Sequence, residues 1–215
     1  VYNKPMIEYG LESLRDARIK DVCVVLGGAK PEQIMQYLGD GFRYDLNLSY
    51  KWQGEPKGIA HAIQCAKDYI GDQKFIVYLA DNLFESGVSK FVKDFQTLDC
   101  DAYLPLKEVK HPERYGVVVL NNGAIIDIEE KPKHPKSNLV DVGLYGFKPT
   151  IFGVIEKLKP SWRGEYEITD AIKYMITNDG FTVEYAILES KWFDAGTFES
   201  ILDASLFMRK KMRGR

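Results

Sequence analysis

The sequence of 215 residues predicts an α/β fold built on a mostly parallel sheet. Short apolar runs with the length of buried strands, at 21–27 and 75–79, alternate with segments whose apolar residues recur at helical spacing. Alternation of strands and helices favours parallel pairing through right-handed crossovers. Asn122-Gly123 between two β-rich runs predicts an antiparallel hairpin. We therefore expect one domain, residues 1–215, with a mixed sheet.

The first half of the chain carries the strand and helix alternation. Ile7, Leu11 and Leu14 share one face of a helix that follows the opening loop. Pro31 and Gly39 have the positions expected just inside the start and just past the end of a helix. In order, we expect a helix from residue 7, a strand at 21–27, a helix at 31–38, a strand at 46–50, a polar loop at 53–58 and a helix at 59–70.

The run 75–79 reads as a parallel strand covered on both faces, and Asp81 and Asn82 follow it directly. Ligands bind at the carboxyl ends of strands in open α/β sheets, so Asp81 has the position of a metal or ligand-binding carboxylate. Asp and Asn also cap helices well, and spacing alone does not separate the two interpretations.

The second half contains the hairpin. Pro105 suits an edge strand, and Gly143 indicates a close approach of another backbone or a ligand. The expected elements are a helix at 86–98, a strand at 101–106, the hairpin at 115–120 and 124–130, a strand at 139–147, a helix at 150–158, a helix at 167–177, a strand at 181–188 and a helix to about residue 208.

Composition excludes several classes of protein. A net charge of −2 gives no electrostatic reason to expect nucleic acid or membrane as a partner. The three cysteines are widely spaced and odd in number, which favours a reduced, cytoplasmic protein. No apolar run approaches the length of a membrane span. The basic end at 209–215 is typical of a solvated helix end, and His61, His111 and His134 lack metal-site spacing.

Four polar clusters could carry chemistry, and each has a structural alternative. They are Asp81-Asn82, residues 129–132, residues 163–165 and residues 192–197. The alternatives are a helix cap, a solvated strand end, a surface arginine and an N-cap formed by Asp194 or Thr197. Two aspartates at strand ends could meet across one sheet edge and hold Mg²⁺.

Together these motifs resemble the sugar-1-phosphate nucleotidyltransferases, among them the glucose-1-phosphate thymidylyltransferases. The resembling stretches follow the order of that family and cover nearly the whole chain: 4–7, 38–41, 53–60, 80–82, 112–117, 130–132, 143–145, 163–170 and 192–197. The resemblance implies a three-layer α/β/α, Rossmann-like fold with a small β-hairpin excursion over the sugar. It also implies transfer of a nucleotidyl group from dTTP or UTP to a sugar 1-phosphate, with glucose 1-phosphate favoured.

The resemblance further implies a role for each site residue. Gln53, Gly58 and Asp81 would bind the nucleotide, and Asp81 and Asp194 would hold Mg²⁺. Lys131 and Arg163 would act with these aspartates in catalysis. The sugar-phosphate site would comprise Asn82, Tyr115, Gly116, Glu130, Lys131, Gly143 and Arg163. The residues agree with such chemistry, which needs in-line positioning and charge neutralisation more than proton transfer.

One departure from the family pattern is large. The chain starts just after the family's first strand and its glycine-rich loop carrying an arginine, which grips the triphosphate. A missing central strand would expose two rows of backbone groups and much apolar surface, so we expect these 215 residues alone to lack turnover. The alternative is a catalytically silent nucleotide-sugar-binding or regulatory subunit. A dinucleotide-binding oxidoreductase is disfavoured because no Gly-x-Gly-x-x-Gly occurs. The oligomeric state stays open, a homo-oligomer included.

Overall fold

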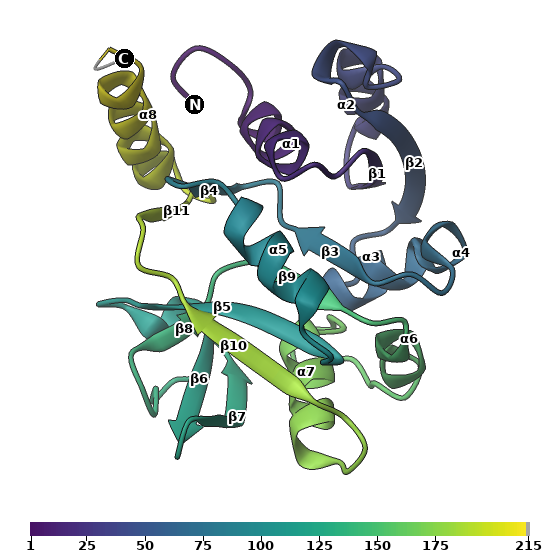
Figure 1. The fold of residues 1–215 in the computed structure, drawn as a ribbon, viewed down its shortest axis with the longest axis vertical. Helices are drawn as coiled ribbons and strands as arrows, with labels where there is room; N and C mark the ends of the chain where they lie inside the picture. The colour runs from purple at the N-terminus through teal and green to yellow at the C-terminus, as the bar shows by residue number, and fades with distance from the viewer. Residues whose placement is uncertain (214–215) are drawn as a thin grey trace.

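The computed structural model describes residues 1–213, so Gly214 and Arg215 of the basic tail lie outside the described residues (Figure 1). The helices are α1 Met6–Asp16, α2 Pro31–Leu38, α3 Ile59–Cys65, α4 Lys67–Ile70, α5 Ser89–Thr97, α6 Thr150–Ile155, α7 Ile168–Thr177 and α8 Phe198–Arg213, with 3-10 helices η1 Phe42–Tyr44 and η2 Pro112–Arg114. The strands are β1 Asp21–Gly27, β2 Asn47–Gly54, β3 Phe75–Tyr78, β4 Asn82–Phe84, β5 Ala102–Glu108, β6 Gly116–Asn121, β7 Ala124–Glu130, β8 Leu139–Asp141, β9 Leu144–Phe147, β10 Val183–Ile187 and β11 Trp192–Asp194.

The predicted α/β class with a mixed sheet is confirmed. The main sheet has the order β3-β9-β5-β8-β6-β7, with β10 added on β5, and β1-β2 and β11-β4 form two small sheets. Among residues 1–213, parallel pairing is confined to β1 with β2 and β10 with β5, so the sheet is less parallel than expected. The difference arises because β6, β7, β8 and β9 pair antiparallel with their neighbours, where sequence alternation predicts only the hairpin β6–β7.

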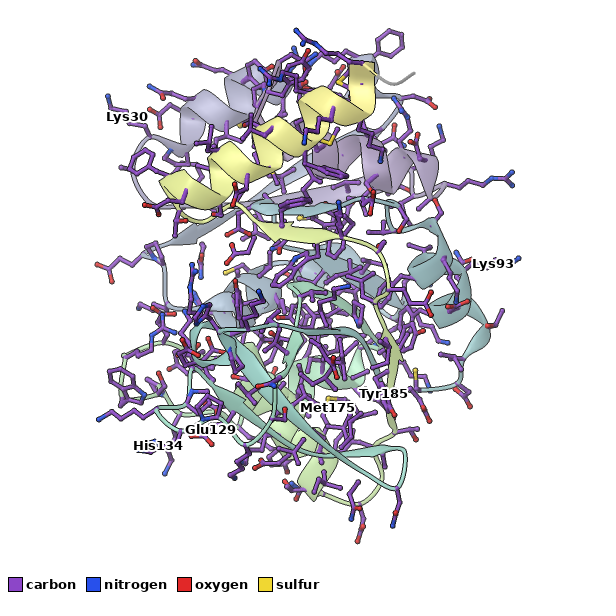
Figure 2. All side chains as sticks on the ribbon, turned by 90° about the vertical axis from the view of Figure 1, so that its left-hand side faces the viewer. Lys30, Lys93, Glu129, His134, Met175 and Tyr185 are labelled. Atoms are coloured by element: carbon purple, nitrogen blue, oxygen red, sulfur yellow. The ribbon has the colours of Figure 1, made fainter. Side chains whose placement is uncertain are left out.

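Side-chain alternation along β5 divides the core into two layers. Ala102 and Leu104 point into a cluster with α3, α6 and α7, where Ile172 is 0% exposed. Tyr103 points to the other face and stacks on Phe91 and Phe95 of α5. Helices therefore cover both faces of the main sheet, which gives the expected three-layer α/β/α arrangement (Figure 1). Figure 2 shows Met175 of α7 inside the molecule, while Lys30 and Lys93 extend outward.

Two expectations about strand position are wrong. β3 is not a parallel strand between two neighbours: it pairs antiparallel with β9, Phe75 opposite Phe147, and with no other strand in residues 1–213. β5 is not an edge strand despite Pro105, because it lies between β10 and the β9 and β8 partners. Pro105 is tolerated there because β9 pairs with residues 102–103 and β8 with 106–108, which leaves the proline between the two ladders.

Two predicted elements are each divided. The strand expected at 139–147 is split into β8 and β9 by Gly143, whose φ of 68° few side chains adopt. The helix expected at 59–70 is split into α3 and α4 at Ala66, which has φ −92° and ψ 0°. The other predicted helices and strands differ from the observed ones mainly at their ends, whereas the short strands β4 and β11 were not predicted.

A large cavity of about 1310 Å³ with a mainly apolar lining separates the β1–β2 sheet from β3. Leu11 and Leu14 of α1 and Val24 of β1 line one side, and Ile63 and Ile76 line the other. The cavity extends along β3 to Leu79, Ala80 and Asp81. Since interiors are normally close-packed, a cavity of this size between two strand edges has the character of an unfilled place in a sheet.

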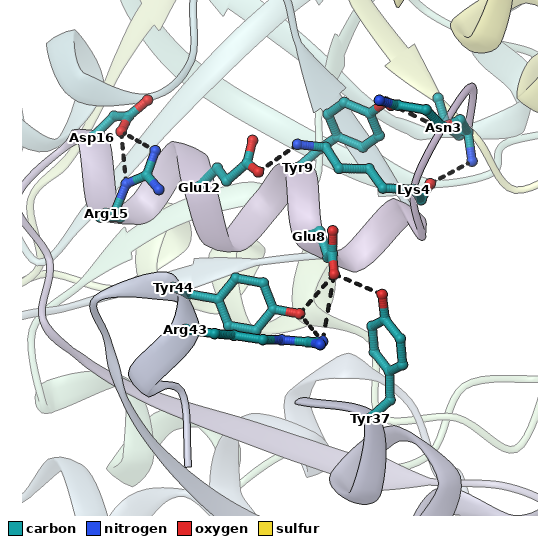
Figure 3. Close-up of polar contacts among 11 residues, drawn as sticks. Asn3, Lys4, Glu8, Tyr9, Glu12, Arg15, Asp16, Tyr37, Arg43 and Tyr44 are labelled. Carbon is teal, nitrogen blue, oxygen red and sulfur yellow. Dashed lines mark hydrogen bonds and ion pairs between the residues drawn. The ribbon is translucent and has the colours of Figure 1, made fainter. Parts of the chain in front are cut away.

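A polar cluster on Glu8 attaches α1 to α2 and η1 (Figure 3). Glu8 Oε1 accepts hydrogen bonds from the Tyr37 hydroxyl at 2.7 Å and the Tyr44 hydroxyl at 2.8 Å. Burial opposes the charged form, yet these hydrogen bonds and the charges of Arg43 and Lys4 together outweigh it and lower the pKa of Glu8. The α1 side of the cavity is thus held by polar contacts.

None of the helices in residues 1–213 has the length and apolar character needed to cross a membrane.

Candidate active site at the strand ends

The structure brings Asp81 and Asp194 together. The short strands β4 and β11 pair antiparallel with Asp194 opposite Asn82, and the Ala195 N–H donates to the Asp81 carbonyl at 2.8 Å. Both carboxylates approach Gly196: a Cβ there would lie 3.0 Å from Asp194 Oδ1 and 3.9 Å from Asp81 Oδ2. Burial, followed by the charge of Asp194, raises the pKa of Asp81. Two acidic side chains more than 100 residues apart therefore share one small site.

The helix-cap alternatives do not hold for either aspartate. Asp81 is followed by the strand β4, so it caps no helix. Thr197 serves the start of α8, where its Oγ1 accepts the Ser200 N–H at 3.2 Å. Asp194 Oδ1 instead accepts the Gly196 N–H at 3.1 Å in the turn between β11 and α8.

The carboxylate pair fits Mg²⁺ in the chemistry of its donors. Mg²⁺ is bound through one or two carboxylates, keeps several waters and takes oxygens from substrate phosphates. Within residues 1–213, no group of three or more His, Cys, Asp or Glu side chains has the arrangement of a closed metal site. A cation held by Asp81 and Asp194 would accordingly depend on a phosphate ligand.

Asn82 lies behind Asp81 and orients it. Its side chain is only 4% exposed, and its Nδ2 donates to Asp81 Oδ1 at 2.9 Å. The Trp192 indole N–H donates to Asn82 Oδ1 at 2.6 Å, so both ends of the amide are engaged. Gly143 leaves room for this amide, since a Cβ there would lie 2.6 Å from Asn82 Nδ2.

A cationic group lies at the end of β7. Arg163 is 25% exposed and its guanidinium lies 3.0 Å from Glu165, 3.5 Å from Glu167 and 3.6 Å from Glu130. Lys131 Nζ is 3.7 Å from the same Glu130 oxygen. Burial, followed by the charge of Glu167, raises the pKa of Glu130. The arrangement places two cations among three carboxylates, and these groups can bind the phosphate and the hydroxyls of one ligand.

Tyr115 connects the carboxylate pair to the cationic group. Its ring packs edge-on against Trp192 with centroids 5.3 Å apart, and burial, followed by the charge of Asp194, raises its pKa. Its carbonyl accepts the Lys131 N–H at 3.0 Å. The next residue, Gly116, pairs with Glu130 across β6–β7, and a Cβ there would lie 2.7 Å from Thr169. A series of contacts therefore links Asp194 through Tyr115, Lys131 and Glu130 to Arg163.

Gln53 lies near the end of β2, and Gly58 lies on the following loop, which packs against the segment after Arg163. Gln53 Nε2 donates to the Gly58 carbonyl at 3.0 Å and contacts His61 Nδ1 at 3.2 Å. Gly58 has φ 98°, and a Cβ there would come within 2.5 Å of the Tyr166 carbonyl. Close packing against Tyr166 therefore explains why residue 58 is glycine. No hydrogen bond in residues 1–213 joins Gln53 or Gly58 directly to Asp81 or Asp194.

Several residues around the site were not predicted from sequence. Glu167 is 5% exposed and receives a hydrogen bond from Ser161 at 2.9 Å, and Thr169 donates to Glu130 at 3.2 Å. Asp141 and Tyr145 form a buried pair behind Gly116. A carboxylate inside the apolar run 139–147 is the signal that could have identified Asp141. His111 and His134 are exposed loop residues, as predicted.

The structure is that of an α/β/α protein with paired carboxylates and cations at its strand ends, groups of the kind that bind metal ions and phosphates. The family model described as "Nucleotidyl transferase" matches residues 1–211. The chain belongs to the nucleotidyl transferase family. This confirms the family that the sequence motifs indicate.

Relatives of known name agree with this membership. The chain is 43% identical over 206 residues to the low-salt glycan biosynthesis nucleotidyltransferase Agl11 of Haloferax volcanii, and 40% identical over 206 residues to a glucose-1-phosphate thymidylyltransferase of Streptomyces griseus. Each alignment covers 95% of this chain but only 57% and 58% of those relatives, so the chain spans less than two thirds of their length.

Solved structures agree in fold. A Bacillus anthracis protein assigned as a glucose-1-phosphate thymidylyltransferase, solved with sucrose, has a TM-score of 0.89 at 34% identity, covering 97% of this chain and 84% of the other. A UDP-glucose pyrophosphorylase with UDP-glucose has a TM-score of 0.83 at 27% identity, covering 97% and 88%.

Proposed function

We propose that this chain forms the domain that transfers a nucleotidyl group from dTTP or UTP to a sugar 1-phosphate. A phosphate oxygen of the sugar 1-phosphate attacks the α-phosphorus, the bond between the α-phosphorus and the bridging oxygen breaks, and pyrophosphate leaves. The nucleophile is already ionised at neutral pH, so the protein supplies position and charge compensation without a general base. Names of relatives favour glucose as the sugar and thymidylyl or uridylyl transfer.

The observation that carries this proposal is the series of contacts that links Asp194 through Tyr115, Lys131 and Glu130 to Arg163. Arg163 and Lys131 would hold the sugar phosphate, while Glu130, Gly116 and the Gly143 turn would bound the sugar. Arg163 is restrained by three carboxylates, so phosphate binding there would exchange one anionic partner for another. Such a pre-positioned guanidinium suits a ligand that must be held in one orientation.

Asp81 and Asp194 would hold Mg²⁺ together with the phosphates of the nucleoside triphosphate. When bound, the cation would compensate the negative charge that collects around the α-phosphorus. Asn82 would keep Asp81 in place through the 2.9 Å hydrogen bond, and Trp192 would in turn fix Asn82. Gln53 and Gly58 would face the nucleotide base.

The cavity bears on turnover. We propose that one more extended apolar segment belongs between β1 and β3, and that these 215 residues without it bind ligands but do not turn over. Support comes from the 1310 Å³ volume and from its mainly apolar lining by strands and helices on both sides. If no such segment ever occupies the cavity, the same observation favours the second candidate function, a catalytically silent nucleotide-sugar-binding subunit.

Pyrophosphate release tests the proposal. The protein extended by a strand and glycine-rich loop should release pyrophosphate from dTTP or UTP with glucose 1-phosphate, and Asp194→Asn should reduce the rate by about 100-fold or more. Asp203→Asn, on exposed α8, is the matched control and should keep the rate. Ligand binding without pyrophosphate release in the extended protein would favour the silent subunit.

A further inference from the structure

Asp141, at the end of β8, is a buried carboxylate to which the reaction assigns no role. It is 7% exposed, and its Oδ2 accepts the Tyr145 hydroxyl at 2.9 Å. The backbone N–H of Gly116 also donates to this carboxylate. No lysine or arginine in residues 1–213 lies within ion-pair distance of it. A buried carboxylate held only by neutral donors is costly in its charged form.

Asp141 lies directly behind the proposed sugar-phosphate site. A Cβ on Gly116 would lie 3.0 Å from both carboxylate oxygens of Asp141 and 2.7 Å from Thr169 Cγ2. Gly116 pairs with Glu130 across the strands, and Thr169 donates to Glu130. Asp141 and Glu130 are therefore two carboxylates on opposite sides of one glycine. Burial, followed by the charge of Glu130, raises the pKa of Asp141 to about 7.

We propose that Asp141 is a positioning residue for Gly116 and Glu130, and that its ionisation weakens the binding of a sugar 1-phosphate. This inference rests on the proposed function of the site. In its neutral form Asp141 holds the start of β6 without adding charge behind Glu130. In its ionised form it places a second negative charge behind a site that must accept a phosphate.

Linkage sets the direction of the effect. A bound anion favours the protonated form of Asp141, so binding becomes weaker as pH rises through the range where Asp141 ionises. The groups that face Asp141 are Tyr145 from β9, Glu130 and Lys131 at the end of β7, the Gly116 amide from β6 and the uncharged Thr169 from α7. Lys131 acts in the opposite sense to Glu130, and burial and Glu130 outweigh it.

The test is calorimetric titration of glucose 1-phosphate between pH 6 and 8.5 into the wild type, Asp141→Asn and Asp101→Asn. Asp101 is a matched control because it is also a buried carboxylate, 9% exposed, that accepts hydrogen bonds from Thr150 and the Thr182 N–H. It directly precedes β5. Ionisation of the ligand phosphate is common to all three proteins and cancels in ratios of affinity.

Between pH 6.5 and 8.5 we expect the affinity of the wild type and of Asp101→Asn to fall by about tenfold relative to Asp141→Asn. A merely structural role for Asp141 would lower affinity equally at every pH, and an identical pH dependence in Asp141→Asn and wild type would overturn the inference. Absence of wild-type binding at any pH would overturn the proposed function itself.

A second measurement does not need a variant. Carbon NMR of the Asp141 carboxyl group in the wild type should give a midpoint near neutral pH that rises when glucose 1-phosphate is saturating. A midpoint that glucose 1-phosphate leaves unchanged would also overturn the inference.

Discussion

The two sides of β3 differ in how completely they are packed. On the β9 side, β3 joins a sheet covered by helices on both faces, and Phe75 stacks on Phe152 with ring centroids 5.5 Å apart. On the β1 side, β3 borders the 1310 Å³ cavity. The cationic part of the candidate site belongs to the packed side, whereas Asp81 lies where the two sides meet. We infer that the sugar-phosphate side is preformed and that the nucleotide side depends on filling the cavity.

The largest expected effect is a difference in the free energy of unfolding between two isoleucine substitutions, one on each side of β3. Ile172→Ala, at a position 0% exposed, should lower the free energy of unfolding by about 2–5 kcal/mol because it leaves a void in close-packed core. Ile76→Ala, on the cavity side, should cost about 1 kcal/mol or less because the space beside it is already open.

Urea unfolding of both variants measures the difference, and the extended protein supplies the control. There, Ile76→Ala should cost as much as a core substitution. Equal costs at Ile76 and Ile172 in the 215-residue chain would show that the cavity is closed in solution.

The next effect concerns the packed side alone. Arg163→Met should weaken glucose 1-phosphate binding to the 215-residue chain by about 1.5–3 kcal/mol, the contribution of a hydrogen bond to a charged group. Lys159→Met removes an exposed cation from the same loop and should leave the affinity unchanged. Calorimetry checks both, and equal losses would indicate only a general electrostatic attraction to the loop.

The smallest expected effect concerns the polar cluster on Glu8, which holds α1 beside the cavity. Glu8→Gln should cost about 1 kcal/mol at pH 7, because it replaces charge-assisted hydrogen bonds from Tyr37 and Tyr44 with neutral ones. The folded-state pKa of Glu8 is lowered, so its contribution is present above the unfolded-state pKa and is lost as pH falls through the folded-state value.

Chemical unfolding of wild type and Glu8→Gln between pH 3 and 7 should therefore show two curves that converge at acidic pH. Curves that stay parallel over this range would assign the cost to packing and not to the charge of Glu8.

Local sequence patterns predicted most helices and strands, but they did not predict which strands pair with one another. The Asn122-Gly123 turn and the Pro31 and Gly39 signals lie within the elements they define, so β6–β7 and α2 followed from sequence. The pairing of β3 with β9 joins residues about 70 positions apart, and no local pattern reports it. Pro105 misled for the same reason, since its tolerance depends on where β9 and β8 each end.

The candidate site shows the same division. Asp81, Asp194, Glu130, Lys131 and Arg163 stood out because they lie at strand ends or precede a helix. The structure pairs Asp81 with Asp194 and groups Glu130, Lys131 and Arg163. Asp141 and Glu167 were missed because their importance comes from burial among residues distant in sequence. The partners of a buried carboxylate cannot be read from its neighbours in the chain.

We infer above all that the packed side is a preformed sugar-phosphate site and that one more strand would complete the nucleotide side. Pyrophosphate release with dTTP and glucose 1-phosphate tests it most directly, measured for these 215 residues and for the same chain extended by an apolar strand and a glycine-rich loop carrying an arginine. We expect turnover only in the extended protein. A matching rate from the 215 residues alone would contradict it.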